Sequence, residues 1–301
     1  MRSFSVFKIS PEHQGLTVEA YLKQILHYSG RKLQKLTRKK GILLNNKPVF
    51  LQRNLSAADT LSILILEDAS YGVQPEKGSI TILYEDECLL VLDKPARQLV
   101  HPAGRTNSGT LANYLAFHFK ERNVVAAIRP LHRLDRDTSG CVIFAKNAES
   151  QSKLEQQLKA GQLKRTYQAL VKGFIEPPIG TINAAIGAHP QHPNRRTITP
   201  TGEQAITHYK VLEKYNNASL VELNLETGRT HQIRLHLAYL GNPILGDGMY
   251  GVRSPLIARQ ALHASSVTFY HLKEKRQLTV DAPLPGDFTQ AIGNLRQAGF
   301  C

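Results

Sequence analysis

The sequence is short of cysteine, of long apolar runs and of acidic residues. Its three cysteines, Cys88, Cys141 and Cys301, are widely spaced and odd in number, which argues against a disulfide framework and a paired metal motif. The densest apolar run, residues 61–66, is far shorter than the ~18 residues that a membrane helix needs. The N-terminal residues lack the apolar core of a signal peptide. We therefore expect a cytoplasmic protein with reduced thiols and no membrane contact.

Motifs for nucleotide cofactors and metals are also missing. There is no P-loop and no GxGxxG, and strands do not alternate strictly with helices, which disfavours nucleotide-cofactor folds. His231 and His236 are five residues apart, unlike the i, i+4 pair of a zinc-binding helix. We expect neither a cofactor nor a metal ion. The length of 301 residues, with 42% hydrophobic residues, predicts a folded chain of about two domains.

Basic residues are in large excess and unevenly distributed. The formal net charge is +14, and residues 1–65 contain 11 basic and 3 acidic residues, a net charge of +8. Such an excess indicates a polyanionic partner, either nucleic acid or a membrane surface. Its concentration in about a fifth of the chain is typical of an appended nucleic-acid-binding module, although a merely soluble basic surface is an alternative.

The N-terminal part is predicted to form helix, basic helix and strands. Apolar spacing predicts an amphipathic helix over residues 16–27 with Thr17 as N-cap. A second helix is expected to begin after the cap Ser29 and to end at Gly41 in a left-handed conformation. Strands are expected within residues 42–50 and 61–66, with a turn at Asn45-Asn46.

The second predicted helix has six cations and no acid between Arg31 and Lys40, which suits the phosphates of a folded RNA. The segment resembles the S-four (alpha-L) RNA-binding domain over residues 14–66, although Asn46 stands where that family usually has glycine. The resemblance implies RNA contacts for the helix. The predicted contacts are Arg31, Lys32, Lys35, Arg38 and Lys39.

A polar segment at residues 67–79 is predicted to be a linker to a second domain, residues 80–301. Helices are expected at 110–121, 149–160 and 231–240. Several short strands lie between them, separated by glycine, proline and asparagine. The sequence therefore predicts an α+β fold with a mixed, mostly antiparallel sheet and flanking helices.

Two segments of this domain concentrate reactive side chains. Residues 129–140 read RPLHRLDRDTSG and place Asp135 and Asp137 just before an apolar strand. Residues 227–236 read TGRTHQIRLH; Gly228 predicts a tight bend, and His231 and Arg234 share a helix face. An arginine there can hold a buried aspartate ionised. Taken alone, Asp135 could equally be structural, and the second segment is more typical of a helix that faces RNA.

Taken together, the ordered motifs of residues 80–283 resemble the RluA-type pseudouridine synthases, which act on ribosomal or transfer RNA. The matching segments are VLDKPARQLVHP, RPLHRLDRDTSG, KRTYQALVKG, TGRTHQIRLHLAYLGNPILGD and RQALHA. Arg97 departs from the family pattern, which has glycine after DKPA. An S-four module is a common partner of this catalytic domain.

The resemblance implies that a uridine is flipped out, its C1′–N1 bond is cleaved, and C5 is joined to C1′ without a cofactor. Asp135 then carries the indispensable carboxylate, as a nucleophile or as the base that takes a ribose proton. Arg234 is its cationic partner, Tyr167 the active-site tyrosine and Leu262 the apolar wall under the base. Asp137 is a turn residue.

The resemblance also implies RNA contacts near the site. Arg133 matches the residue that fills the gap left by the flipped base. Arg229 and His231, at the start of the last helix, are predicted to face the RNA. The expected partner is structured RNA, with large-subunit rRNA favoured over tRNA by family habit, and the expected state is a monomer.

Two other functions remain open from the sequence. A non-catalytic RNA-binding or ribosome-assembly factor would also explain the charge and the S-four module. A glycosidase or nuclease that uses Asp135 with Asp137 is the third hypothesis, but two carboxylates at i, i+2 in a turn can point apart.

Overall fold

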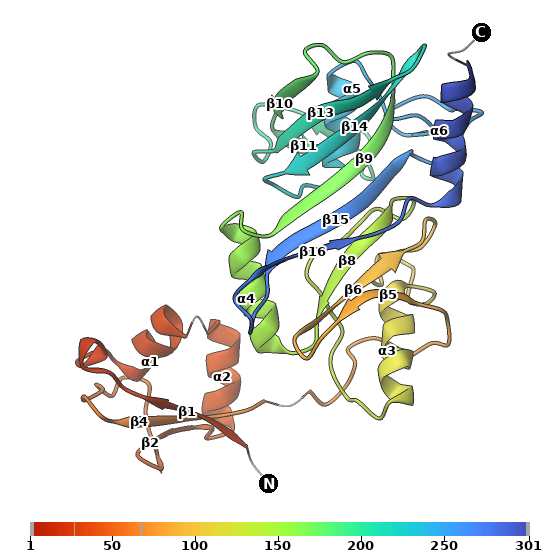
Figure 1. Cartoon of the computed structure of the whole chain (residues 1–301). Helices are drawn as coiled ribbons and strands as arrows, with labels where there is room; N and C mark the ends of the chain where they lie inside the picture. The colour runs from red at the N-terminus through yellow and green to blue at the C-terminus, as the bar shows by residue number, and fades with distance from the viewer. Residues whose placement is uncertain (1–2, 27, 67, 299–301) are drawn as a thin grey trace. The chain divides into compact units, whose positions relative to one another are not determined.

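The computed structural model describes residues 3–26, 28–66 and 68–298 (Figure 1). The chain divides into two compact units, Met1–Ala69 and Ser70–Cys301. Cys88 and Cys141 are free and buried, whereas Cys301 lies outside the described residues. No described helix is both long and apolar enough to cross a membrane.

The first unit is an antiparallel sheet with two helical segments. Its strand order is β1-β4-β2-β3, with bounds Phe4–Lys8, Thr60–Leu64, Ile42–Leu44 and Lys47–Pro48. The short turn η1 (Pro11–His13) precedes α1 (Val18–Ala20), which continues as η2 (Tyr21–Ile25), and α2 (Gly30–Arg38) follows. Strand β1, which pairs with β4, was not predicted. Apolar residues of the helices and of β4 are buried together: Val18, Leu22, Leu36, Leu61 and Ile63.

The predicted caps of this unit are confirmed in part. The Thr17 hydroxyl accepts from the Ala20 amide at 3.1 Å, and the Ser29 hydroxyl accepts from the Lys32 amide at 3.3 Å. The expectation of a left-handed Gly41 is wrong, because Lys40 takes that conformation, with φ 48°. Glycine is needed at 41 for packing instead, since a Cβ there would lie 2.7 Å from the Leu64 Cβ.

The first predicted helix is shorter than expected and is partly a π-helix. It covers residues 18–25 rather than 16–27, and the Leu26 amide donates to the Tyr21 carbonyl, five residues back, at 3.1 Å. The turn at Asn45-Asn46 is confirmed. Both residues are left-handed, with φ of 49° and 65°, as a two-residue hairpin turn requires.

The second unit contains a ten-stranded sheet, ordered β10-β13-β14-β9-β15-β8-β6-β5, with β16 paired to β15 and β7 to β8 (Figure 1). All pairs are antiparallel except β15 with β8, so the predicted mixed, mostly antiparallel α+β fold is confirmed. The bounds are β5 Thr81–Glu85, β6 Leu89–Lys94, β7 Arg129–Pro130, β8 Ser139–Ala145, β9 Lys164–Lys172, β10 Ile179–Asn183, β13 Ile206–Lys214, β14 Ala218–Leu225, β15 Leu262–Tyr270 and β16 Gln277–Asp281. A separate hairpin joins β11 (Ile186–Ala188) to β12 (Arg196–Ile198).

Four helices accompany this sheet: α3 Leu111–Glu121, α4 Ala148–Lys159, α5 Gln232–Tyr239 and α6 Gly286–Ala298. The first three were predicted, whereas α6 was not. Strand β6 is buried on both faces. Leu90 and Leu92 join the large core that contains residues of α3 and α6, and Leu89 and Val91 join a smaller core that contains Leu154 of α4. Burial on both faces explains why the strand is apolar at four successive positions, 89–92.

The expected linker at residues 67–79 has no helix or strand among its described residues, 68–79. From Ser70 onward it belongs to the second unit. The Ile128 amide donates to the Tyr71 carbonyl, the Asn113 amide group to the Gln74 carbonyl, and the Gly109 amide to the Glu76 carboxylate. The last two bonds attach the segment to the start of α3.

Gly140 fixes the direction in which the chain leaves the 135–138 turn. It lies in β8 opposite Ala264 of β15, with φ 109°. A Cβ at this position would lie 2.2 Å from the Ala264 carbonyl oxygen, so only glycine fits. The close parallel approach of the two strands therefore positions the segment that carries Asp135.

Candidate active site

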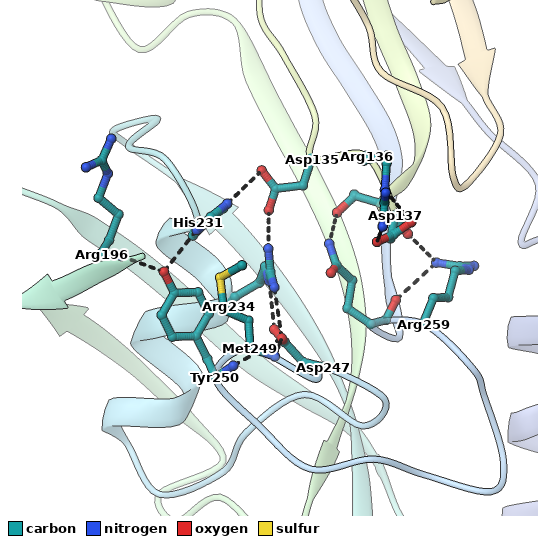
Figure 2. Close-up of polar contacts among 12 residues, drawn as sticks. Asp135, Arg136, Asp137, Arg196, His231, Arg234, Asp247, Met249, Tyr250 and Arg259 are labelled. Carbon is teal, nitrogen blue, oxygen red and sulfur yellow. Dashed lines mark hydrogen bonds and ion pairs between the residues drawn. The ribbon is translucent and has the colours of Figure 1, made fainter. Parts of the chain in front are cut away.

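The two reactive segments meet in the second unit, although 99 positions separate Asp135 from Arg234. Asp135 lies in the turn before β8, where the Thr138 amide closes back onto the Asp135 carbonyl. Arg234 lies in the first turn of α5 and donates from Nη1 to Asp135 Oδ2 at 3.0 Å (Figure 2). A single charge-assisted hydrogen bond thus orients the carboxylate.

Asp247 holds the other side of the Arg234 guanidinium. The Nε and Nη2 atoms donate to the two Asp247 oxygens at 2.7 and 2.8 Å (Figure 2). Burial alone would raise the pKa of Asp247, but the guanidinium and two backbone amides outweigh burial and lower it. Burial opposes the charge of Arg234 as well, yet the two carboxylates raise its pKa. Arg234 is therefore a fixed cation that keeps its Nη1 group for Asp135.

A tight turn positions Asp247. Gly246 has φ 75°, and a Cβ there would lie 2.1 Å from the Arg259 carbonyl oxygen. The Asp247 carboxylate in turn accepts from the Met249 and Tyr250 amides at 2.9 and 3.2 Å. Sequence reasoning did not single out Asp247. The available signal was a buried arginine that needs a carboxylate, combined with the aspartate of GNPILGD downstream.

His231 lies near the other oxygen of the Asp135 carboxylate, the one that Arg234 does not contact. It is left-handed, with φ 60°, at the N-cap of α5, and its Nε2 lies 3.9 Å from Asp135 Oδ1. The Tyr250 hydroxyl accepts from the Arg196 amide at 2.7 Å, which leaves its proton to donate to His231 Nδ1 at 2.9 Å (Figure 2). Burial lowers the pKa of His231 although Asp135 opposes this, so the ring is neutral at pH 7 and carries its proton on Nε2.

A cavity of about 420 Å³ opens beside Asp135. Tyr167 of β9 and Leu262 of β15 line it and are buried, whereas Arg133 is at its exposed rim. Burial raises the pKa of Tyr167, so its hydroxyl stays protonated at neutral pH. The cavity therefore places the Asp135 carboxylate, the Tyr167 ring and the apolar Leu262 side chain around one space. Its size is in the range of small-ligand pockets.

Arg165 is a further cavity residue that sequence reasoning missed. It lies two positions before Tyr167 on β9, and its side chain is buried at 7% exposure. Its Nε is buried without a hydrogen-bond partner in the described part of the chain. Gly228, predicted to provide a tight bend, leaves room for this side chain, since a Cβ there would lie 3.0 Å from Arg165 Nη1.

Lys94 stabilises the turn that carries Asp135 and Asp137. It is fully buried and donates to the carbonyls of Pro95, Gln98 and Arg136 at 2.8, 2.8 and 3.1 Å. Burial lowers the pKa of Lys94 to about 7, with Asp137 acting in the opposite direction. Its three hydrogen bonds fix residues 95–98 against the segment that carries Asp135 and Asp137.

Some of the residues predicted to contact RNA are engaged within the protein, and others are exposed. The Arg229 guanidinium is engaged by the Glu203 carboxylate at 2.5 Å and the Gln204 carbonyl at 3.1 Å. In the first unit, the Lys32 amine lies 3.3 Å from the centre of the Tyr28 ring. Three further cations of α2 and its C-cap are exposed: Lys35, Arg38 and Lys39. The side chain of Arg31 lies outside the described residues.

Arg97 occupies a backbone conformation that glycine favours, with φ 66°. Left-handed geometry costs a residue with a Cβ roughly 1 kcal/mol. We expect Arg97→Gly to raise the free energy of unfolding by up to about 1 kcal/mol relative to Arg97→Ala, which removes the same charge but keeps the Cβ. Urea denaturation of both variants measures this difference. Equal stabilities would show that the turn is not strained.

The described residues, 3–26, 28–66 and 68–298, contain no group of three or more His, Cys, Asp or Glu side chains that could hold a metal ion.

Comparison with known proteins identifies the family. A model of the RNA pseudouridylate synthase family matches residues 88–239. An uncharacterised RNA pseudouridine synthase of Bacillus subtilis is 40% identical over 281 residues, which are 93% of each chain. Ribosomal large subunit pseudouridine synthase D of Nitrosomonas europaea is 37% identical over 93% of this chain and 86% of its own. The solved structure of human RNA pseudouridylate synthase domain containing 1 is 26% identical, with a TM-score of 0.58, over 75% of this chain and 98% of its own. The chain belongs to the RNA pseudouridylate synthase family.

Proposed function

We propose that this protein converts specific uridines of large-subunit rRNA to pseudouridine, with Asp135 as the reacting carboxylate. The observation that carries the proposal is the position of Asp135, which Arg234 holds at the cavity lined by Tyr167 and Leu262. Large-subunit rRNA is favoured over tRNA because a relative of 37% identity is named for the ribosomal large subunit.

The cavity suits a uracil that has left the RNA helix. The base would stack on the Tyr167 ring and pack against Leu262, with the Arg165 side chain in the same wall. Exposed Arg133 at the rim would fill the gap in the helix. Asp135 would act at the ribose, either at C1′ as a nucleophile or on a ribose proton as a base.

The reaction balances within the substrate. The C1′–N1 bond breaks, the uracil turns, C5 bonds to C1′, and the proton on C5 leaves while N1 gains one. No electron or group is exchanged with a cofactor. Arg234 keeps the carboxylate oriented through these steps, and the neutral His231 presents its Nε2 proton toward Asp135.

Asp137 does not support the glycosidase or nuclease alternative. Its carboxylate bonds the Arg136 guanidinium at 3.2 and 3.3 Å and lines a different cavity from that of Asp135. The two carboxylates of the turn therefore do not face one scissile bond, as a two-carboxylate hydrolase requires.

Tritium release tests the proposed function directly. RNA labelled with tritium at uracil C5 loses the label when the C5–C1′ bond forms. Unmodified rRNA and tRNA are incubated separately with the protein, and the expected result is release from rRNA. Release from tRNA alone would overturn the rRNA assignment, and no release from either pool would favour an RNA-binding assembly factor.

We further propose that residues 14–66 form an S-four-like RNA-binding domain, joined by residues 67–79 to a catalytic domain at 80–301. One chain carries every group named above, so we propose a monomer that acts in the cytoplasm. The exposed cations of α2 support the RNA-binding role of the first domain because no acidic residue interrupts them.

Neutralising α2 should weaken RNA binding and its salt dependence. For a variant with Lys35, Arg38 and Lys39 changed to Gln, we expect the log–log slope of affinity against salt to fall by roughly one unit per lost phosphate contact. Filter binding at several salt concentrations measures the slope. A control variant loses three exposed cations of the second unit, Lys77, Lys120 and Lys275. Equal slopes for the two variants would remove α2 from the interface.

A further inference from the structure

A second cavity lies beside the proposed uridine pocket. It has a volume of about 510 Å³ and shares Arg234 with the first cavity. The turn that places Asp135 in the first cavity places Asp137 in the second. The two cavities therefore flank one short segment of the chain, and consecutive parts of one ligand strand could occupy both.

The wall of the second cavity contains arginines that are paired with carboxylates and arginines that are not. Arg234 is neutralised by its carboxylate partners, and Arg259 donates from Nε and Nη2 to the Asp287 oxygens at 2.7 and 2.9 Å. Arg195 and Arg253 are exposed, and within residues 3–26, 28–66 and 68–298 no carboxylate pairs with either guanidinium. The cavity thus has two cations whose charge the protein leaves uncompensated.

No carboxylate in the wall competes for these cations. Asp137 is the one acidic residue among the described lining residues, and its side chain is engaged by Arg136. A guanidinium without a carboxylate partner is suited to bidentate recognition of a phosphate. The charge of the wall therefore favours an anionic ligand.

The rest of the lining suits a base better than a free inorganic anion. Met249, Ile257 and Ala258 provide apolar surface, and Gln260 provides an amide. A cavity with apolar walls and two cations matches a nucleotide, which combines a flat base with a phosphate. We propose that this cavity binds the nucleotide next to the target uridine in the same RNA strand, with Arg195 and Arg253 on its phosphate. This inference rests on the proposed function.

A phosphate bound at Arg195 would also act on the side of the site that contains His231 and Asp135. Arg195 precedes β12, whose first residue, Arg196, donates its amide to the Tyr250 hydroxyl. That hydroxyl contacts His231, which faces Asp135 (Figure 2). A phosphate on Arg195 would therefore restrain the hairpin that supports this side of the site.

The test compares the double variant Arg195→Gln, Arg253→Gln with a control double variant, Lys120→Gln, Arg122→Gln. The control pair is exposed at the end of α3, lines neither cavity and removes the same charge. With a tritium-labelled stem–loop of large-subunit rRNA, we expect KM to rise about 10- to 100-fold for the cavity variant, with kcat changed less than about 3-fold. The log–log salt slope should fall by about 0.7, the value for one neutralised phosphate of a single strand.

A chemical change in the RNA locates the contact. A methylphosphonate replaces, in turn, the phosphate on either side of the target uridine. For the wild type, one of the two replacements should weaken binding about 10-fold or more. For the cavity variant, which already lacks the two arginines, the same replacement should weaken binding by less than about 2-fold. Equal losses for both proteins at both positions, or a cavity variant that behaves as the control does, would overturn the inference.

Binding measurements keep this test separate from the proposed function. The affinities are measured by fluorescence anisotropy on the Asp135→Asn background, which needs no turnover. Absence of tritium release from the wild type contradicts the proposed function, whereas loss of the arginine–phosphate coupling contradicts only the second site. If the double glutamine variant is poorly folded, Arg195→Lys and Arg253→Lys keep the charge and should retain the salt slope while losing affinity.

Discussion

Asp135→Asn is expected to abolish tritium release while leaving folding and RNA binding intact. The amide has the shape of the carboxylate but can neither attack C1′ nor take a ribose proton. Arg234 stays paired with Asp247 through two hydrogen bonds, so its charge is not left unpaired. We expect turnover to fall by at least about 10⁴-fold, as for other indispensable catalytic groups. The rate is measured by tritium release and the dissociation constant by filter binding.

Asp137→Asn provides the matched control, because it makes the same chemical change two residues further along the same turn. Its carboxylate contacts Arg136 at the surface and not Arg234, so turnover should stay within about 3-fold of the wild type. The assignment of Asp135 would be contradicted if both variants lost activity equally. It would also be contradicted if Asp135→Asn weakened RNA binding as much as it slowed turnover.

The local elements of the site could be predicted from the sequence, because their signals are local. The turn before β8 follows from Asp137-Thr138-Ser139-Gly140, and α5 follows from apolar spacing that ends at Gly241. The meeting of Asp135 and Arg234 rested on the family resemblance. Residues 99 positions apart carry no local signal of contact.

The supporting residues show why the remainder could not be predicted. Asp247 acts only because Gly246 allows a close approach to Arg259, and Tyr250 acts only because β12 presents the Arg196 amide to it. Both are tertiary contacts of residue types that are ordinary in turns. Backbone conformation was also hidden, since Lys40 and His231 adopt left-handed geometry that sequence reasoning reserves for glycine.

Arg234 connects the two cavities and the two turns that carry their side chains. It lines the proposed uridine pocket and the second cavity and links the 135–137 turn to the 246–250 turn. Because Asp247 binds Nε and Nη2 in a bidentate pair, the guanidinium plane is fixed and Nη1 is directed at Asp135. We therefore propose that the orientation of Asp135 depends on Asp247, a carboxylate that bonds Arg234 from the side opposite Asp135.

Asp247→Asn should consequently lose both stability and activity. Asp247 is 1% exposed, and its replacement leaves the buried Arg234 without a matching anion. Breaking a buried pair of this kind costs about 3–5 kcal/mol, and we expect the free energy of unfolding at pH 7 to fall by that amount. Turnover should fall because the Nη1 donor is no longer held on Asp135. Urea denaturation and tritium release measure the two effects.

The control is Asp287→Asn, which removes a bidentate partner of Arg259 with the same geometry. That carboxylate is 47% exposed and bonds Arg259 rather than Arg234, so we expect smaller losses of stability and of turnover than for Asp247→Asn. If Asp247→Asn were no less stable than Asp287→Asn, or fully active, the supporting role of Asp247 would be wrong.

The pH dependence of stability shows whether Asp247→Asn acts through the lost charge or through disturbed packing. The folded pKa of Asp247 lies below its unfolded value of 3.8: burial acts to raise it, but Arg234 and the backbone amides outweigh burial. Its contribution is therefore fully present above pH 3.8 and is lost as the pH falls through the folded pKa. The stability difference between wild type and Asp247→Asn should be constant from pH 7 to about pH 5 and should shrink below pH 3.8. A difference that stayed constant into acid would mean that the asparagine disrupts packing rather than charge.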